Sequence, residues 1–357
     1  MKRFQIVLLV MPLLYWAGCG DDENGDNEGN PVISGRTIYI VGSDDGGACY
    51  WVNGSRVELP GGAWATDIVV VDGTVYASGQ GDAYEACYWI NQEIYELPGN
   101  GGEAEAIAVD GDDVYVAGWF NNGSCYWKNG ERINLTTNGE SMAFAIGIRN
   151  NGDVFVGGYY VNNHHYVIPC YWKNGNNRSN LPVPTGGDGE VYDITFDEAG
   201  NMRYYAGYTM KPGGFAGYVP KAARWRHTVR TDLPNGTSSI DLYGTGSYGI
   251  TIDGEDIYVA GYTDWLGDIN DDYTGGTFPR YWKNNKAHDL EGGPHDGNFG
   301  TGQANDIRVA DGNVVVVGMA TGGPTGESAC YWLNGELNYL EDVIGEYSSE
   351  AKGVFIE

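Results

Sequence analysis

The chain has 357 residues, and its 48 acidic residues against 20 basic ones give a formal net charge of −28 at pH 7. This balance excludes nucleic acid as a partner, because phosphate binding requires a basic surface. The 57 glycines and 27 tyrosines are typical of a chain with many turns and β-strands.

The first 18 residues are predicted to be an export signal. Lys2 and Arg3 precede a short apolar run that ends in small residues before Cys19, which is the pattern of a cleaved signal peptide. The segment resembles a bacterial lipoprotein signal, and this resemblance implies that Cys19 is lipidated after cleavage. An ordinary secretory signal is the alternative, and it would leave the protein untethered.

Residues 19–34 are expected to form a disordered acidic tether. The stretch GDDENGDNEGN has no large apolar residue, so it cannot bury enough surface to offset the entropy of ordering. It resembles the acidic segment after the lipidated cysteine of Bacteroidetes lipoproteins. That resemblance implies a lipid anchor in the outer membrane, exposure at the cell surface, and membrane contact through the lipid alone; a plain solvated linker is the alternative.

Residues 35–357 repeat a unit of four short β-type segments. In the clearest copy these are AIAVD (106–110), VYVAGW (114–119), CYWKNG (125–130) and ERINL (131–135). First segments begin at Ile68, Ile107, Ile146, Ile194, Ile250, Ile307 and Val354. A four-stranded unit recurring at this spacing predicts an all-β fold, a seven-bladed β-propeller of antiparallel blades.

The two ends of the array are predicted to complete one blade together. The first unit lacks its first strand, and the chain ends in GVFIE, a first strand with no unit after it. Pairing of 354–356 beside 37–41 would close the ring, whereas an open solenoid would need polar capping repeats.

The repeated motif CYWxNG is predicted to be the third strand of a blade and the turn that follows it. Asn-Gly suits a tight hairpin whose central residues have positive φ. The motif resembles the HAF-type repeats of bacterial extracellular propellers and is loosely similar to kelch repeats. The five cysteines at this position are expected to be buried packing groups, because equivalent points on neighbouring blades lie too far apart for a disulfide.

Long connections are predicted to gather on one face of the ring and to carry its function. They are rich in aromatic and amide side chains, which suit sugars because rings stack on C–H faces while polar groups meet hydroxyls. The candidate ligand-binding residues are Trp64, Trp119, Phe120, Tyr160, His165, Tyr208, Tyr243 and Trp265. The alternative is that these aromatics only pack their own loops.

Calcium is the single cofactor that the sequence suggests. Asp268, Asn270 and Asp272 alternate as in a calcium loop, but the glycine at the sixth place and the glutamate at the twelfth are missing. No motif for zinc, nucleotide or nucleophilic catalysis accompanies them.

The predicted function is a non-catalytic surface module that binds glycan or a surface protein. A polysaccharide-acting enzyme, a glycosidase or lyase with carboxylates in the central funnel, is the first alternative, although no catalytic residue stands out. A structural or adhesive protein is the second.

Overall fold

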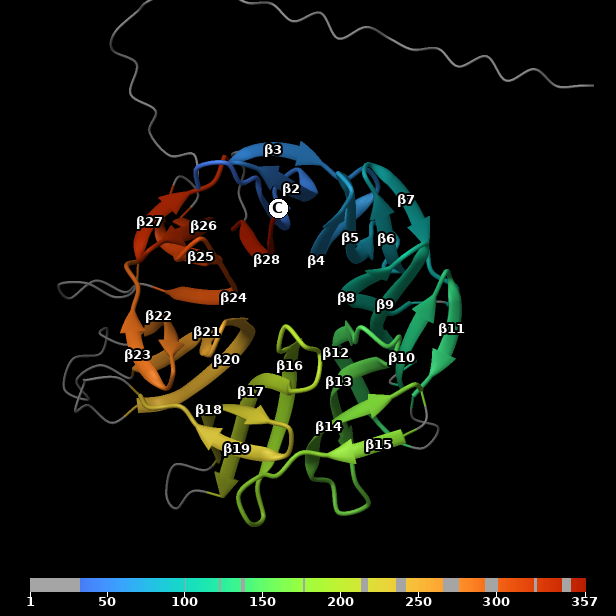
Figure 1. Ribbon diagram of the computed structural model, residues 1–357, viewed down its shortest axis with the longest axis vertical. Helices are drawn as coiled ribbons and strands as arrows, with labels where there is room; N and C mark the ends of the chain where they lie inside the picture. The colour runs from blue at the N-terminus through green and yellow to red at the C-terminus, as the bar shows by residue number, and fades with distance from the viewer. Residues whose placement is uncertain are drawn as a thin grey trace, which may run out of the picture.

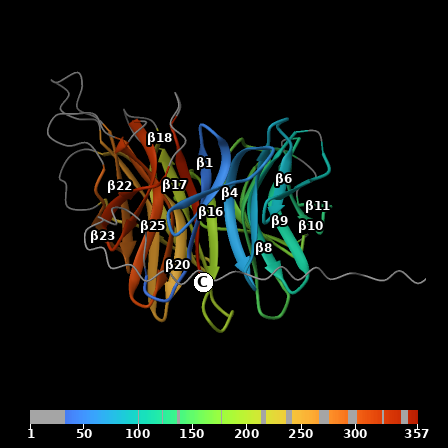
Figure 2. The ribbon, with the colours of Figure 1, turned by 90° about the horizontal axis from the view of Figure 1, so that it is seen from above.

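The computed structural model describes residues 33–99, 101–121, 123–135, 139–175, 177–212, 218–235, 242–265, 276–292, 301–323, 326–341 and 348–357. In these ranges the chain forms seven four-stranded antiparallel sheets, which stand as blades around a central axis (Figure 1). The predicted seven-bladed propeller is thus confirmed. Seen from the side, the strands run between the two faces of the ring (Figure 2).

Each blade contributes one strand to each of four concentric positions. The innermost strands are β28 (Glu350–Ile356), β4 (Gly62–Val71), β8 (Glu103–Asp110), β12 (Ser141–Ile148), β16 (Asp188–Phe196), β20 (Leu242–Asp253) and β24 (Gly302–Ala310). The second strands are β1 (Ile38–Asp44), β5 (Thr74–Gly81), β9 (Asp113–Phe120), β13 (Val154–Val161), β17 (Arg203–Pro212), β21 (Asp256–Trp265) and β25 (Asn313–Gly323). The third strands are β2 (Gly47–Val52), β6 (Ala86–Ile90), β10 (Gly123–Lys128), β14 (Val167–Lys173), β18 (Tyr218–Arg226), β22 (Gly276–Lys283) and β26 (Gly326–Leu333). The outermost strands are β3 (Ser55–Glu58), β7 (Glu93–Glu96), β11 (Glu131–Asn134), β15 (Asn177–Asn180), β19 (Val229–Asp232), β23 (Lys286–Asp289) and β27 (Glu336–Tyr339).

The two ends of the array meet in one blade. The last strand, β28, pairs antiparallel with β1, with Ile356 opposite Ile38 and Val354 opposite Ile40. The backbones of Thr37 and Glu357 exchange two further hydrogen bonds of 3.0 Å. The predicted closure is therefore confirmed, and it leaves the first blade as complete as the others.

The CYWxNG motif forms the third strand and a tight turn. In Asn129-Gly130, φ is 50° and 79°, the conformation that the handedness of a two-residue hairpin requires. Oδ1 of Asn129 also accepts a 2.8 Å hydrogen bond from the N–H of Val114 on the second strand. Asn at this position therefore both permits the turn and satisfies a backbone donor.

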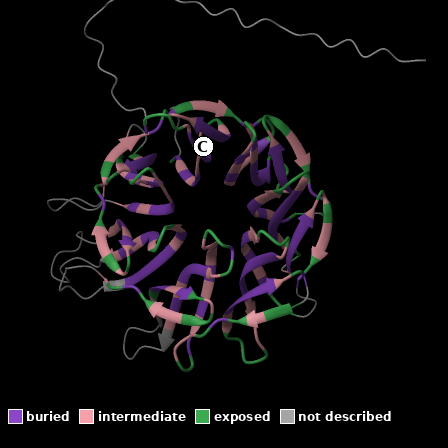
Figure 3. Cartoon of the chain, in the orientation of Figure 1, coloured by how far each residue is buried: buried purple, intermediate pink, exposed green. Residues whose placement is uncertain are grey.

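The third strand supplies the packing between blades, which explains why its motif repeats. The tryptophans of this motif, Trp51, Trp89, Trp127, Trp172, Trp225, Trp282 and Trp332, are at most 1% exposed. The described cysteines, Cys49, Cys87, Cys125, Cys170 and Cys330, are buried free thiols, as predicted. Burial is most continuous on the second and third strands of the blades and falls toward the outermost ones (Figure 3).

Several of these tryptophans also form a hydrogen bond to the preceding blade. Nε1 of Trp89 donates to the carbonyl of Pro60, the residue after the closing leucine of the preceding blade, at 3.1 Å. Nε1 of Trp51 makes the equivalent 2.6 Å bond to the carbonyl of Glu341 across the ring closure. A large apolar ring with one satisfied donor is therefore the unit that joins neighbouring blades.

Residues 1–32 lie outside the described ranges, and so do the predicted signal, Cys19 and most of the tether. Among the described residues there is no helix with the length and hydrophobicity to span a bilayer.

A candidate ligand pocket on the propeller axis

Every innermost strand carries a β-bulge at the same place. In β4, for example, Ala65 pairs with Gly79 and Asp67 pairs with Ser78, so Thr66 is the extra residue. The bulged residues of β28, β4, β8, β12, β16, β20 and β24 are Lys352, Thr66, Glu105, Phe144, Tyr192, Tyr248 and Asn305. Bulges redirect side chains and are common next to binding and active sites.

The bulge explains a glycine that every second strand carries. A Cβ on Gly118 of β9 would lie 2.0 Å from the carbonyl oxygen of Glu103, and one on Gly318 of β25 would lie 1.8 Å from that of Gln303. The equivalent glycines are Gly42, Gly79, Gly158, Gly207 and Gly261, with corresponding distances of 1.9 to 2.2 Å. Only glycine allows the bulged strand to approach this closely, so the glycine and the bulge occur together.

The bulge residue varies, while the residue before it and the one two places after it keep their character. The seven tetrapeptides are ATDI, AEAI, AFAI, VYDI, SYGI, ANDI and AKGV, beginning at residues 65, 104, 143, 191, 247, 304 and 351. A small buried residue precedes the bulge and Ile or Val follows two places later. One copy carries an acid, one a base, two carry polar uncharged groups and three carry aromatic rings, so the side chain at this position changes its chemistry from blade to blade.

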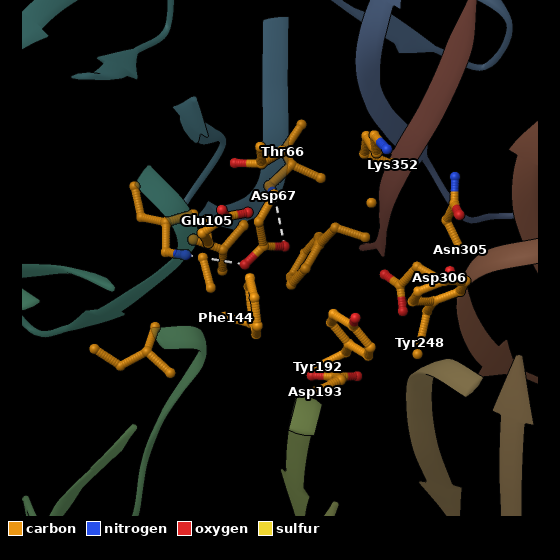
Figure 4. A pocket seen from close by; sticks show the side chains of 18 of the residues that line it. Thr66, Asp67, Glu105, Phe144, Tyr192, Asp193, Tyr248, Asn305, Asp306 and Lys352 are labelled. Carbon is orange, nitrogen blue, oxygen red and sulfur yellow. Dashed lines mark hydrogen bonds between the residues drawn. The ribbon is translucent and has the colours of Figure 1, made fainter. Parts of the chain in front are cut away.

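All seven bulge residues line one central pocket with a volume of about 660 Å³. Around the ring they form two arcs. Phe144, Tyr192 and Tyr248 come from three consecutive blades and form the aromatic arc, whereas Asn305, Lys352, Thr66 and Glu105 come from the other four and form the polar arc. Figure 4 shows the three rings along one side and Thr66, Lys352 and Asn305 along the other.

Three aspartates that line the pocket, Asp67, Asp193 and Asp306, join neighbouring inner strands. Oδ1 of Asp67 accepts the N–H of Ile68 at 2.8 Å, and Oδ2 accepts the N–H of Ile107 on the next blade at 2.9 Å. Asp193 bonds Ile194 and Ile250 in the same way, and Asp306 bonds Ile307 and Val354, at 2.7 to 3.0 Å. Both oxygens of each carboxylate are thus engaged by the main chain, and their role is structural.

Arg308 compensates part of this buried negative charge. Its Nη1 donates to Oδ1 of Asp306 at 2.7 Å and to the carbonyl of Ile307 at 2.8 Å. Attraction from Asp306, Asp193 and Asp67 outweighs burial and raises the pKa of Arg308. Burial, reinforced by Asp306, raises the pKa of Asp67 to about 6 and that of Asp193 to about 8.

Three glutamates, Glu103, Glu105 and Glu350, line the pocket together with Lys352. Nε1 of Trp64 donates to Oε1 of Glu103 at 2.6 Å, and Nζ of Lys352 lies 2.8 Å from Oε2 of Glu350. Burial and then the charge of Glu103 raise the pKa of Glu105 to about 8, although Lys352 and the Trp119 indole oppose the shift. Burial therefore favours the protonated form of Glu105.

The aromatic arc is a continuous series of rings. Tyr192 lies between Phe144 and Tyr248, with ring centroids 4.9 and 5.0 Å away. Tyr159 and Tyr262 extend the series from the second strands, at 6.0 Å from Phe144 and 5.7 Å from Tyr248. These separations are those of favourable ring pairs.

The residues predicted from the sequence lie in three settings. Trp64 lines the pocket, and Trp119 is opposite Glu103 in the β8–β9 pairing. Tyr208 is 5.9 Å from Tyr192 and supports the aromatic arc from β17. These three residues are therefore close to the central pocket.

Three other predicted residues lie outside the residues that line the pocket. The guanidinium of Arg132 covers the ring of Phe120 at 4.2 Å, and that of Arg178 covers Tyr160 at 3.5 Å. His165 is exposed in the turn between β13 and β14, with φ of 62°. The side chains of Tyr243 and Trp265, and the whole of Asp268, Asn270 and Asp272, fall outside the described residues.

Within the described ranges, no three His, Cys, Asp or Glu residues are grouped so that they could hold a metal ion. The sequence interpretation did not identify the bulge residues, Glu190 or Arg308. The repeated tetrapeptides and the glycine of the second strand are the signals that could have revealed the bulge residues.

No protein-family model matches the chain, and no curated protein matches its sequence. Solved structures share the fold. The extracellular domain of a one component system from B. thetaiotaomicron is 9% identical, with a TM-score of 0.46 over 81% of this chain and 38% of that one. A puromycin-hydrolyzing peptidase from Mycobacterium tuberculosis is 13% identical, with a TM-score of 0.50 over 89% of this chain and 53% of that one.

The tricorn protease is 12% identical, with a TM-score of 0.47 over 87% of this chain and 35% of that one. This chain thus spans between about a third and a half of the length of these three structures. At such identities the similarity extends to the propeller fold alone.

Proposed function

We propose that the chain is a non-catalytic binding protein that holds a glycan in its central pocket. The observation that carries this proposal is the ring of seven bulge residues, which differ in chemistry while the strands that hold them repeat. A volume of about 660 Å³ lies within the range of ligand sites in proteins.

Glycan is the ligand class that fits the two arcs best. Sugars present C–H faces that stack on aromatic rings and hydroxyl groups that bond to amides and carboxylates. The pocket offers Phe144, Tyr192 and Tyr248 for the first purpose, and Gln303, Asn305 and Glu103 for the second. The acidic chain disfavours strongly anionic polymers.

The setting proposed for this binding is the outer surface of the cell, with a lipid on Cys19 as the anchor. The apolar leader and the acidic segment after Cys19 support this part of the proposal. A pocket on the axis of a ring tethered in this way would remain accessible to extracellular polymers.

Affinity electrophoresis tests the binding proposal. The purified chain would be run through gels containing laminarin, dextran, xylan or polygalacturonate, beside the double variant Tyr192→Ala, Tyr248→Ala. Tyr84→Ala is the matched control, because Tyr84 is 68% exposed in the β5–β6 connection and does not line the pocket. We expect retardation of the wild type and Tyr84→Ala in a neutral polysaccharide and free migration of the double variant. Free migration of the wild type in every gel would contradict the proposal.

Cleavage of a glycan is a second candidate, favoured by Glu105. Its pKa of about 8 would let it supply a proton at neutral pH, as a general acid must. Release of reducing ends from one of these polysaccharides, abolished in Glu105→Gln, would replace the binding function with a catalytic one. Asp67, Asp193 and Asp306 are poor candidates for this role because the main chain engages both oxygens of each.

A further inference from the structure

Glu190 lies next to the aromatic arc without lining the pocket. It sits on β16, two residues before the bulge residue Tyr192. One carboxylate oxygen, Oε2, accepts the hydroxyl of Tyr192 at 2.8 Å, and the other, Oε1, accepts the hydroxyl of Tyr208 at 2.7 Å. A single carboxylate thus holds two tyrosines, one from the inner strand and one from the second strand.

This arrangement fixes the middle of the aromatic arc. A tyrosine ring rotates about two side-chain torsions, and a hydroxyl bound to an anchored carboxylate restricts both of them. Tyr192 also packs between Phe144 and Tyr248, at 4.9 and 5.0 Å. The ring therefore has a neighbour on each side and a fixed hydroxyl, so its position is determined before any ligand arrives.

The same arrangement decides what the arc can offer a ligand. The hydroxyls of Tyr192 and Tyr208 are already committed to Glu190, so these residues present ring surface rather than free hydrogen-bonding groups. Polar groups for a ligand come from the opposite side, where Gln303 and Asn305 line the pocket with Glu103. The Asn305 amide donates to Glu350 and Ala351, and the Gln303 amide donates to Asn305, so this side offers mainly oxygen acceptors.

We propose that Glu190 is a positioning residue that holds Phe144, Tyr192 and Tyr248 as a rigid stacking platform, and that the ligand lies with its apolar face on this platform. The ligand class is a neutral sugar with one C–H face, oriented with its hydroxyls toward the polar arc. This inference rests on the proposed function for its ligand, but the rigidity of the platform is a property of the free protein and can be measured without one.

Near-ultraviolet circular dichroism of the full chain tests the platform directly, because coupled tyrosine rings give a signal only while their mutual orientation is fixed. Glu190→Ala leaves the hydroxyls of Tyr192 and Tyr208, two of the 27 tyrosines, without this acceptor, and is expected to lose their contribution as a reproducible difference from the wild-type spectrum in the tyrosine region. Glu190→Gln is expected to retain most of this contribution, because an amide can accept from one hydroxyl and donate to the other. Glu255→Ala, in the exposed turn between β20 and β21, is the control.

Two results would overturn the proposal at this stage. One is a near-ultraviolet spectrum of Glu190→Ala that superimposes on the wild type. The other is an equal loss in Glu190→Ala and Glu190→Gln, because rescue by the amide is what distinguishes a hydrogen-bonded clamp from a general effect on folding. The cooperative thermal transition of each variant, followed by far-ultraviolet dichroism, shows that the propeller itself remains folded.

Binding supplies the second measurement, with laminarin as the neutral probe and polygalacturonate as the anionic one. Releasing two ordered rings should weaken laminarin retention by Glu190→Ala by about tenfold, because both side chains must then be ordered when the ligand binds. Unchanged retention of this variant, or stronger retention of the wild type by polygalacturonate, would overturn the proposed orientation and ligand class. If the wild type bound no glycan, the proposed function and this ligand class would fail, while the dichroism would still decide whether Glu190 orders the rings.

Discussion

Asp193 offers the sharpest test of how the blades are joined. Its carboxylate accepts the N–H of Ile194 in its own blade and the N–H of Ile250 in the next blade, both at 2.7 Å. Ile250 is 1% exposed, so water cannot easily replace the lost acceptor in Asp193→Ala. An unsatisfied buried donor costs about 1–3 kcal/mol. The replacement also removes a carboxylate whose burial is itself unfavourable, so we expect a net loss of about 2–3 kcal/mol in the free energy of unfolding.

The assay is urea unfolding at pH 7, followed by the fluorescence of the buried tryptophans. Asp197→Ala is the matched control, because Asp197 also accepts two backbone N–H groups, those of Asn201 and Met202 at 2.6 and 3.0 Å, but within one surface turn. Water can replace that acceptor, so its loss should cost at most about 1 kcal/mol. Asp193→Asn, which keeps one acceptor oxygen, should fall between the wild type and Asp193→Ala. A free energy of unfolding for Asp193→Ala that lies within about 0.5 kcal/mol of the wild-type value would refute a role of Asp193 in joining the blades. The same holds if Asp193→Ala is no less stable than Asp197→Ala.

Three further predictions concern pH, ring closure and the thiols. The pKa values of Asp67 and Asp193, about 6 and about 8 in the folded protein, lie above their unfolded value, so the folded state binds more protons and these groups lower stability as pH rises from about 4 to 8. Urea unfolding across this range should therefore show that the free energy of unfolding declines with pH, and that it declines less steeply in Asp193→Asn. An equal slope in the wild type and in Asp193→Asn would contradict this prediction. Trp51→Phe removes the 2.6 Å hydrogen bond to Glu341 across the ring closure and should lower the free energy of unfolding by about 1 kcal/mol. Trp89→Phe, at an ordinary blade junction, should have a similar effect. Calorimetry that finds no loss of stability in Trp51→Phe would argue against a stabilising role of this bond. The five described cysteines are buried, and burial raises the pKa of Cys125 to about 12; they are Cys49, Cys87, Cys125, Cys170 and Cys330. A thiol reagent should therefore modify them only after unfolding, as peptide mapping can show. Rapid labelling of any of them in the native protein would be inconsistent with this packing.

The fold was predictable because its signals are local and repeated. Trp127, Asn129 and Gly130 recur as one motif, and each copy reports the same strand and turn. Closure of the ring followed from the missing first strand at one end and the surplus GVFIE at the other. The observed strands extend the predicted segments by a few residues, as in β8, where Glu103–Asp110 replaces 106–110.

The site was not predictable in the same way, because a bulge depends on the register between two strands. In the sequence, Ala104 to Ile107 form a short, mainly apolar run, and nothing in that run alone shows that Glu105 is the extra residue. The pairing of Ala104 with Gly118 and of Ala106 with Ala117 determines it. The sequence interpretation therefore looked for function among conspicuous aromatics such as Phe120 and Tyr160, whose rings the structure places against arginines of their own blades.

The most direct test of the central claim is a crystal structure of the chain soaked with an oligosaccharide of the polysaccharide that retards it. The bulge ring predicts a sugar ring in van der Waals contact, within about 4 Å, with Tyr192 and Tyr248, and hydroxyls that reach Asn305 or Glu103. Sugar density confined to the outer rim, with the axial pocket empty, would contradict the assignment of the bulge ring as the binding site.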